Sequence, residues 1–415
     1  MEIIIHRGAK QIGGSCIEIC SDQTRLIFDI GEELPKTNNP EKAKLKLLVD
    51  DLFVYSKITD RKINGIFISH NHGDHIGLFE TVKEEIPIYI GKTSLEIQNT
   101  IFDFISKDKK IVPERVLENE IPIKINDFIV TPFLIDHSAF DSYAFLIESD
   151  GKKVIYTGDF RRHGAKGVLT EKFAKHPRTQ NPDVLLIEGT NIFKDEFVAD
   201  KEDIIGMKAE AFMRKIQGNI FVLQSSANID RIEQIYKACK KVNRSLIIDI
   251  FTAHILSNLQ DGKYSELKIF YPLWLTRKMH DTPEGTKKMN RFSRRKISKK
   301  ELKSRRDLCI LVRENMLSDI EHRIDYSDAG LIYSKWEGYK KDPKTKYFLE
   351  FFDAPKLETI SLHTSGHADI QTIKDFVRDL NPVKIIPVHT ETPEKFQEIF
   401  GDLVSLIDDK IKIVV

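Results

Sequence analysis

The feature that most constrains this chain is a group of potential metal ligands directly after a short apolar run. The apolar segment GIFIS at 65–69 is followed by His70, Asn71, His72, Gly73, Asp74 and His75. Three histidines and one aspartate in six positions can converge on one point only where a strand gives way to a turn. Histidine nitrogens and carboxylates suit zinc, and manganese with somewhat less preference. The alternative is a polar turn with satisfied histidines. The composition of the run favours a metal site at a sheet edge.

The first 190 residues consist of short β-branched and aromatic runs separated by turns, such as EIIIHRG, TRLIFDIG and KKVIYTGD. Helical periodicity is weak in this part, and the clearest candidate helix lies at 76–85. Polar residues follow several of these strands at their C-terminal ends. Many strands with polar ends predict a sandwich of sheets that carries a site on its rim.

The pattern changes after Glu188 to alternating helices and strands. A helix is expected at 201–216, and the strands NIFVLQS and SLIID flank another helical stretch, which indicates a parallel α/β unit. From about Thr359 the first pattern returns, with a helix at 369–380 between two strands. We therefore predict one domain formed by 1–195 and 356–415, interrupted by an inserted domain at 196–355.

Charge and composition exclude several classes of protein. The 415 residues carry 64 Lys+Arg and 63 Asp+Glu, so the chain does not coat nucleic acid with uniform positive charge. Residues 277–306 form a local basic run, which contains 13 Lys/Arg and only three acidic residues. The run is either a solvated loop or a nucleic-acid contact. The chain has no signal-peptide core, no apolar run near the ~20 residues of a membrane span, and no CxxC pair. These features predict a cytoplasmic protein that does not contact a membrane.

The HxHxDH pattern at 70–75 resembles the signature of the metallo-β-lactamase superfamily. The resemblance implies an αββα sandwich and three further metal ligands at the ends of later strands, namely His137, Asp159 and His389. It also implies two ions, zinc by ligand type with manganese as the alternative. One ion would be held by His70, His72 and His137. The other would be held by Asp74, His75 and His389, with Asp159 between the two.

Within that superfamily the chain is similar to the β-CASP branch, the nucleic-acid-processing group that includes ribonuclease J. The resemblance is carried by Glu188 in LLIEGT, by HTSGHA at 363–368, by PVHTE at 387–391, and by an insertion between the first two. It implies a Rossmann-like inserted domain and a metal-dependent ribonuclease. The catalytic residues would be Asp74, Glu188 and His367, with His367 as the general acid. A substrate phosphate would meet His363, Ser365 and Gly366 before the helix at 369–380.

Two departures from ribonuclease J-like members stand in the second half of the chain. YSKWEG at 333–338 replaces a Gly/Ser-rich phosphate-binding loop, and the chain ends soon after His389, as in a short form without the separate C-terminal domain. The expected partner is RNA, single-stranded rather than duplex, and a homodimer is compatible with the resemblance. RNA over DNA rests on His389, where DNA-processing relatives tend to carry valine. A DNA nuclease, a hydrolase of a small molecule and a non-catalytic binding subunit are the alternatives.

Overall fold

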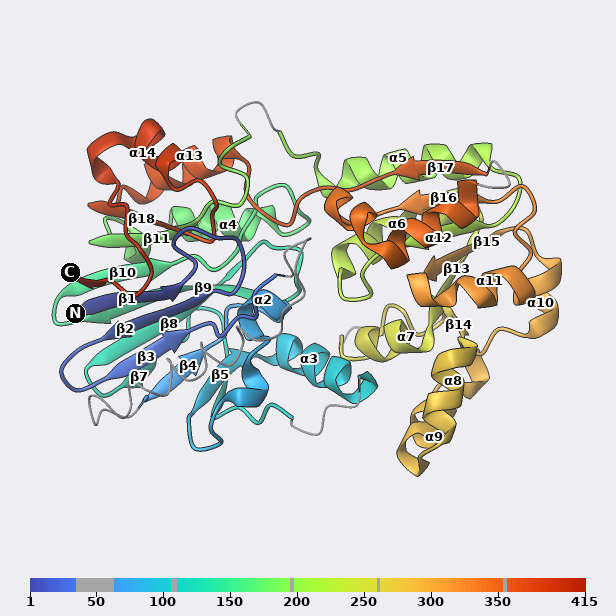
Figure 1. Ribbon diagram of the computed structural model, residues 1–415, viewed down its shortest axis with the longest axis horizontal. Coiled ribbons are helices and arrows are strands. Elements are labelled where there is room, and N and C mark those ends of the chain that lie inside the picture. The colour runs from blue at the N-terminus through green and yellow to red at the C-terminus, as the bar shows by residue number, and fades with distance from the viewer. Residues whose placement is uncertain (35–62, 106–109, 195–197, 260–261, 354–356) are drawn as a thin grey trace. The chain divides into compact units, whose positions relative to one another are not determined.

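The computed structural model describes residues 1–34, 63–105, 110–194, 198–259, 262–353 and 357–415. These residues form two compact units (Figure 1). The sandwich unit comprises 1–199 and 366–415, and the inserted unit comprises 200–365. None of the helices in the described ranges has the length and apolarity needed to cross a membrane.

Two sheets form the centre of the sandwich unit. The first has the order β19-β1-β2-β3-β4-β5-β6, with β1 (Glu2–Arg7), β2 (Cys16–Cys20), β3 (Arg25–Phe28), β4 (Gly65–Phe67), β5 (Ile88–Gly91), β6 (Arg115–Leu117) and β19 (Lys412–Val414). The second has the order β18-β11-β10-β9-β8-β7, with β7 (Ile123–Ile125), β8 (Phe128–Ile135), β9 (Ser142–Ser149), β10 (Lys152–Tyr156), β11 (Val184–Glu188) and β18 (Lys384–Val388).

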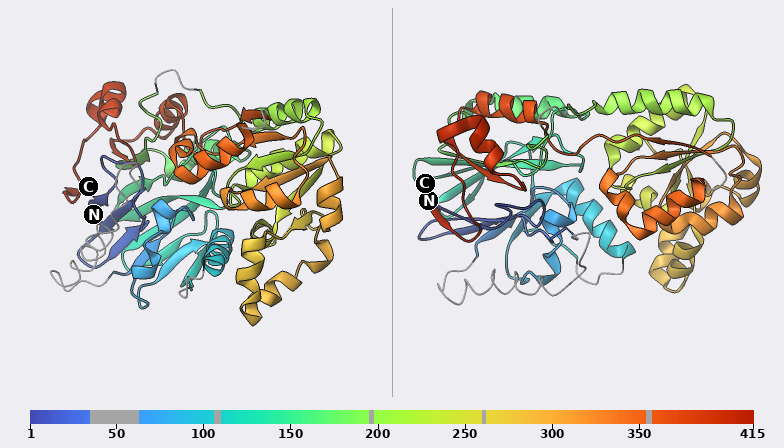
Figure 2. Two further views of the ribbon diagram at one scale, coloured as in Figure 1. Left: turned by 45° about the vertical axis from the view of Figure 1, so that its right-hand side comes forward. Right: turned by 45° about the horizontal axis from the view of Figure 1, so that its top comes forward.

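Apolar side chains from both sheets meet in one core between them. Phe28 and Phe67 of the first sheet stack with ring centroids 5.4 Å apart, and Phe145 of the second sheet packs 5.4 Å from Phe28. Helices cover the outer faces (Figure 2). The second sheet packs against α4 (Gly167–Ala174), α13 (Ile370–Leu380) and α14 (Glu394–Phe400), and the first against α2 (Gly73–Ile76) and α3 (Lys92–Phe104). Short 3₁₀ turns are η1 (Phe79–Thr81), η2 (Pro177–Thr179) and η6 (Gly401–Leu403). The expected αββα sandwich is confirmed.

The return segment completes the second sheet. β18 pairs in parallel with β11, with Leu186 opposite Ile386, and β11 pairs in parallel with β10. The carboxyl ends of these three strands therefore share one edge of the sheet. The whole inserted unit lies between β11 and β18 in the sequence, so residues 200 positions apart become neighbours at that edge.

The inserted unit is built on a parallel sheet of order β14-β13-β15-β12-β16-β17, with helices on both faces (Figure 2). Its strands are β12 (Ile220–Leu223), β13 (Ser245–Asp249), β14 (Lys268–Phe270), β15 (Leu308–Val312), β16 (Gly330–Tyr333) and β17 (Glu358–Ser361). Its helices are α5 (Glu202–Lys215), α6 (Ile229–Lys241), α7 (Ile250–Leu256), α8 (Leu273–His280), α9 (Pro283–Asn290), α10 (Lys299–Ser304), α11 (Leu317–Arg323) and α12 (Pro343–Asp353). Three 3₁₀ turns, η3 (Ser293–Arg295), η4 (Glu314–Met316) and η5 (Glu337–Lys341), complete it.

The structure moves the expected return to the sandwich from residue 356 to Gly366. β17 pairs in parallel with β16, with Ile360 opposite Ile332, so the strand at 358–361 belongs to the inserted unit. The two ends of the inserted unit are joined to each other, since Thr364 Oγ1 donates to the Asp200 carbonyl at 2.6 Å. In the sandwich unit, the residues next to these two ends are also joined, since Ala199 N donates to Asp369 Oδ2 at 3.3 Å.

Candidate metal centre

The candidate ligands lie at or just beyond the ends of apolar strands of the sandwich unit. His70 follows β4, His137 follows β8, Asp159 follows β10, and His389 directly follows β18. His72, Asp74 and His75 lie at the beginning of the short helix α2. Every one of the seven ligands expected from the sequence is therefore carried to the same rim of the sandwich.

One group consists of His70, His72 and His137. Each offers one ring nitrogen, and these atoms lie within 4.8 Å of one another. His137 Nε2 and His72 Nδ1 are 3.2 Å apart, and the ring centroids of His70 and His137 are 4.6 Å apart. Three imidazoles facing a common point form a typical zinc-binding arrangement.

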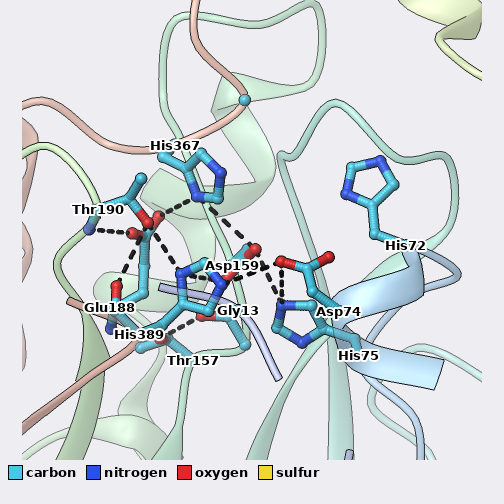
Figure 3. A network of polar contacts seen from close by, with 12 residues as sticks. Gly13, His72, Asp74, His75, Thr157, Asp159, Glu188, Thr190, His367 and His389 are labelled. Carbon is cyan, nitrogen blue, oxygen red and sulfur yellow. Dashed lines mark hydrogen bonds and ion pairs between the residues drawn. The ribbon is translucent and has the colours of Figure 1, made fainter. Parts of the chain in front are cut away.

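A second group consists of Asp74, His75, Asp159 and His389, again with one ligand atom of each within 4.8 Å of the others. His75 Nε2 lies 3.1 Å from Asp159 Oδ2, and His389 Nε2 lies 3.3 Å from Asp74 Oδ2 (Figure 3). Asp159 also approaches the first group, because its Oδ2 is 3.8 Å from His70 Nε2. Asp159 is thus the carboxylate that faces both groups.

Glu188 and His367 adjoin the second group. His367 Nδ1 lies 3.3 Å from Glu188 Oε1 and 3.6 Å from Asp159 Oδ2 (Figure 3). Glu188 is fully buried and accepts hydrogen bonds from three backbone N–H groups, those of Phe160, Thr190 and Ala368. These bonds fix the carboxylate that faces the His367 ring.

Four buried atoms of this centre make no hydrogen bond to any described residue: His70 Nε2, His75 Nε2 and both carboxylate oxygens of Asp159. Buried polar atoms without hydrogen bonds are costly, and the cost is removed when they coordinate a cation. The four atoms belong to the ligand groups described above. The residues present therefore fit one or more divalent metal ions.

The buried side chain of Asp29 sets which nitrogen of two histidines is free to bind a metal. Asp29 Oδ2 lies 2.8 Å from His75 Nδ1, and a carboxylate can only accept, so Nδ1 carries a proton and Nε2 is the nitrogen left for a metal. Ser69 Oγ donates to Asp29 Oδ2 at 2.8 Å and lies 3.0 Å from His70 Nδ1. Because the Ser69 hydroxyl donates its proton to Asp29, it can only accept a hydrogen bond from His70 Nδ1. His70 therefore carries a proton on Nδ1, and its Nε2 is likewise the nitrogen left for a metal.

His137 is oriented in the same manner by a backbone carbonyl. Its Nδ1 donates to the Gly366 carbonyl at 2.6 Å, which leaves Nε2 to face the first group. Gly366 can approach this closely because a Cβ at that position would meet Ser138 Oγ and the His137 ring. His389 has a left-handed backbone, φ 50°, and its Nδ1 lies 2.9 Å from Thr190 Oγ1. Strained non-glycine conformations of this kind gather at functional sites.

Burial and neighbouring charges act differently on the ionisable groups of the centre. Burial holds the pKa of His70 and His137 well below the usual range, so both imidazoles are neutral, as metal coordination would require. Burial also opposes ionisation of Asp159, but the histidines at 389, 75 and 367 outweigh it and hold its pKa well below normal. Burial likewise lowers the pKa of His367, yet the carboxylates of Glu188 and Asp159 raise it to about 9.

The expected phosphate contacts are divided between the units. Gly366 belongs to the sandwich unit, whereas His363 and Ser365 belong to the inserted unit and are not part of the ligand groups. The helix that follows them, α13, carries its own acidic N-cap, since the Asp369 side chain accepts from Thr372 N.

Sequence reasoning missed the residues that orient the ligands: Asp29, Ser69 and Thr190. Asp29 offers the only usable signal. It directly follows the apolar strand RLIF, as Asp159 and His389 follow theirs.

Comparisons with known proteins agree with this geometry. Residues 53–219 match the family described as "Beta-lactamase superfamily domain". Residues 356–398 match the family described as "Zn-dependent metallo-hydrolase RNA specificity domain". Together the two matches contain all seven residues of the ligand groups, as well as Glu188 and His367. They overlap the beginning and the end of the inserted unit.

Several curated relatives are similar to this chain over much of its length. Ribonuclease J of Helicobacter pylori strain J99 is 26% identical over 422 residues, which cover 92% of this chain and 55% of that protein. Ribonuclease J 2 of Streptococcus pyogenes is 22% identical over 254 residues, covering 60% of this chain and 45% of the relative. The chain thus spans about half the length of the curated relatives it matches.

A solved structure extends the likeness to the whole fold. The crystal structure of a protein of unknown function from Enterococcus faecalis V583 matches with a TM-score of 0.78 and 20% identity. The match covers 100% of this chain and 99% of that one, and at this identity it shows the shared fold.

Proposed function

Because this chain belongs to the metallo-β-lactamase superfamily, in its ribonuclease J-like β-CASP branch, we propose that it is a metal-dependent ribonuclease. The observation that supports this proposal most is the convergence of three histidines, and of two carboxylates with two further histidines, on one rim of the sandwich. Hydrolysis of a phosphodiester needs a nucleophile at neutral pH and positive charge beside the phosphate, and such a ligand set can hold the ions that provide both.

We propose two ions per chain, with zinc favoured by the number of imidazoles and manganese as the alternative. His70, His72 and His137 would hold one ion, and Asp74, His75 and His389 the other, with Asp159 shared. Bound ions supply an activated water and neutralise charge on the scissile phosphate. Asp74 is the proposed acceptor of the proton that the attacking water loses, since it is the less buried of the two carboxylates in the second group.

His367 is the proposed general acid. Its ring faces the second group, and its raised pKa, about 9, means that it carries a proton at neutral pH. That proton would pass to the 3′-oxygen as the bond to phosphorus breaks. Glu188 would keep the ring in position and stabilise its charged form, through the 3.3 Å contact to Nδ1.

The proposed substrate is single-stranded RNA, met in the cytoplasm. The relatives named ribonuclease J support RNA, and the name of the second matching family includes RNA specificity. His363, Ser365 and Gly366 remain the predicted contacts of a substrate phosphate. The Asp369 carboxylate caps α13, so we expect backbone N–H groups before residue 369, rather than the first turn of the helix, to meet that phosphate.

The direct test is incubation of metal-loaded protein with end-labelled single-stranded RNA, single-stranded DNA and duplexes. We expect cleavage of single-stranded RNA, abolished by chelation and restored by zinc or manganese. Asp159→Ala should remove cleavage while the circular dichroism spectrum persists. The matched control is Asp402→Ala, an exposed aspartate in the same unit. Turnover of a small ester without any cleavage of RNA would contradict the proposal.

Metal content tests the two-ion arrangement separately. Elemental analysis after metal supplementation and desalting should find close to two equivalents per chain. A protein that never exceeds one equivalent would contradict a dinuclear centre, even if it cleaves RNA.

A further inference from the structure

An exposed tryptophan in the inserted unit is held rigidly by its neighbours. Trp336 follows β16 and is 57% exposed, and Tyr339, three residues later, is 46% exposed. Their rings meet edge to face, with centroids 5.5 Å apart and an interplanar angle of 89°. Large aromatic side chains exposed together on a surface mark interaction sites more often than chance positions.

The backbone around Trp336 is fixed by hydrogen bonds. Its carbonyl accepts from Tyr333 Oη at 2.8 Å and from Tyr339 N at 3.0 Å. Gly338 lies against the indole, since a Cβ at 338 would run into the six-membered part of the ring. The indole therefore rests on a glycine backbone and a tyrosine edge while more than half of it faces solvent. A ring held in this way loses little conformational entropy when a flat ligand stacks on it.

Lysines outnumber acidic residues in the segment around the two rings. Segment 335–347 contains five lysines and two acidic residues. The Lys335 ammonium lies 5.1 Å from the Tyr339 ring centroid, and its Nζ donates to Glu314 Oε1 at 2.6 Å, which fixes it beside that ring. The exposed Lys341 and Lys344 follow. Rigid aromatic rings with lysines beside them are what proteins use to bind single-stranded nucleic acid, by base stacking and phosphate attraction.

We propose that Trp336 and Tyr339 form a stacking platform for the bases of single-stranded RNA. A protein partner would also cover aromatic rings, but the excess of lysine favours a polyanion. The proposal rests on the proposed ribonuclease function and adds a binding surface to it. The platform recognises unpaired bases, because only a base freed from a duplex can lie against the indole.

The chain offers a direct reporter, since Trp274 and Trp336 are its two tryptophans. In a Trp274→Phe background, the fluorescence of Trp336 should be quenched in a saturable manner by an oligoadenylate added with a metal chelator present. An abasic ribose-phosphate oligomer of equal length should leave the fluorescence unchanged. Equal quenching by both oligomers would overturn the proposal, because phosphate alone would then account for the change.

Affinity provides a second measurement. Trp336→Leu should weaken oligoadenylate binding by about 5- to 150-fold, the range for losing one stacked base. Tyr236→Leu is the control, since Tyr236 also has a lysine ammonium over its ring, 4.2 Å from the centroid, and lies on α6 of the same unit. Its loss should leave affinity unchanged. Equal weakening by the two substitutions would overturn the platform.

The two proposals fail in different ways. Anisotropy of a labelled oligonucleotide reports binding without reference to Trp336. If the protein cleaves RNA but the fluorescence of Trp336 does not change on binding, the platform is wrong and the ribonuclease proposal stands. If the protein neither binds nor cleaves RNA, both are wrong.

Discussion

Replacing Asp29 with asparagine should weaken the metal centre, although Asp29 is not one of the expected ligands. The carboxylate accepts from Ser69 N at 2.7 Å, and its other oxygen accepts from Ser69 Oγ, Tyr156 Oη and His75 Nδ1 at 2.7–2.8 Å. An amide has one oxygen for these four bonds. If that oxygen keeps Ser69 N, the NH₂ group faces His75 Nδ1, and the proton of His75 moves to Nε2.

The same change reaches His70. With an NH₂ group in place of Oδ2, the Ser69 hydroxyl accepts a hydrogen bond from residue 29 instead of donating one. Its own proton is then donated to His70 Nδ1, so the ring proton of His70 moves to Nε2. Both histidines then carry a proton on Nε2, the nitrogen that faces the ligand groups. Loss of such an orienting partner typically reduces metal affinity 10- to 100-fold, or about 1.4–2.7 kcal/mol. We expect both proposed metal positions to lose affinity within that range.

Asparagine is a clean substitution at this position. Asp29 has φ 61°, and asparagine tolerates this left-handed region nearly as well as aspartate does. Tyr156→Phe is the matched control, because it removes one hydrogen bond to Asp29 and leaves both histidine tautomers unchanged. Competition with a chelating dye at pH 7 measures the two affinities, and circular dichroism measures the fold. Wild-type affinity in Asp29→Asn, or an equal loss in Tyr156→Phe, would refute the tautomer argument.

Three further predictions address catalysis, substrate binding and stability. His367→Ala should keep its metal content but slow RNA cleavage by about 10²–10⁴-fold. The loss of rate should be smaller for a nitrophenyl phosphodiester, because its leaving group needs no acid. Equal losses of rate on the two substrates would indicate a structural role. The substrate-binding test neutralises four exposed residues of the basic run, Arg294, Lys299, Lys300 and Lys303. The slope of log K for RNA binding against log salt should then fall by about 0.7 per lost phosphate contact. An unchanged slope would mean that the run is a solvated surface. Burial opposes the ionisation of Glu18, yet His6 and Arg25 hold its pKa at about 2, so its stabilising effect should be complete above about pH 4.5 and be lost as pH falls toward 2. The difference in urea midpoint between wild type and Glu18→Gln should therefore shrink over that interval, and a constant difference would contradict the assignment.

The strand ends of the sandwich could be predicted because burial on both faces leaves a distinct pattern. Strands such as β10 and β11 are covered on one face by the other sheet and on the other face by helices, so their sequences are largely apolar. A polar residue that follows such a strand, such as Asp159, is therefore easily recognised in the sequence. The residues that orient the ligands could not be predicted with the same ease. Ser69 and Thr190 are small hydroxyl residues whose importance depends on which histidine nitrogen they meet in three dimensions.

Helix positions near the metal motif were less accessible to sequence reasoning. The expected helix at 76–85 is wrong: α2 ends at Ile76, and only the 3₁₀ turn η1 follows. The longer helix α3 was missed, because polar residues interrupt its apolar positions. The sequence predicts that the strand at 358–361 belongs to the returning part of the sandwich domain. A strand that pairs with β16 and a strand that pairs within the sandwich show the same pattern of apolar residues. Only the register with β16 distinguishes them.

The paired ends of the inserted unit have a consequence for the order of folding. Closing a flexible loop costs entropy that grows with the logarithm of its length, so an unfolded stretch the size of 200–365 costs about 3 kcal/mol more to close than a turn of five residues. Once the insertion has folded, the bond between Thr364 and Asp200 holds its ends together, and only the linking segments 189–199 and 366–383 then separate β11 from β18. We therefore expect the insertion to fold before the sheet edge that carries His389 is complete. A substitution deep in the insertion should then delay the appearance of metal binding during refolding, without touching any residue of the centre.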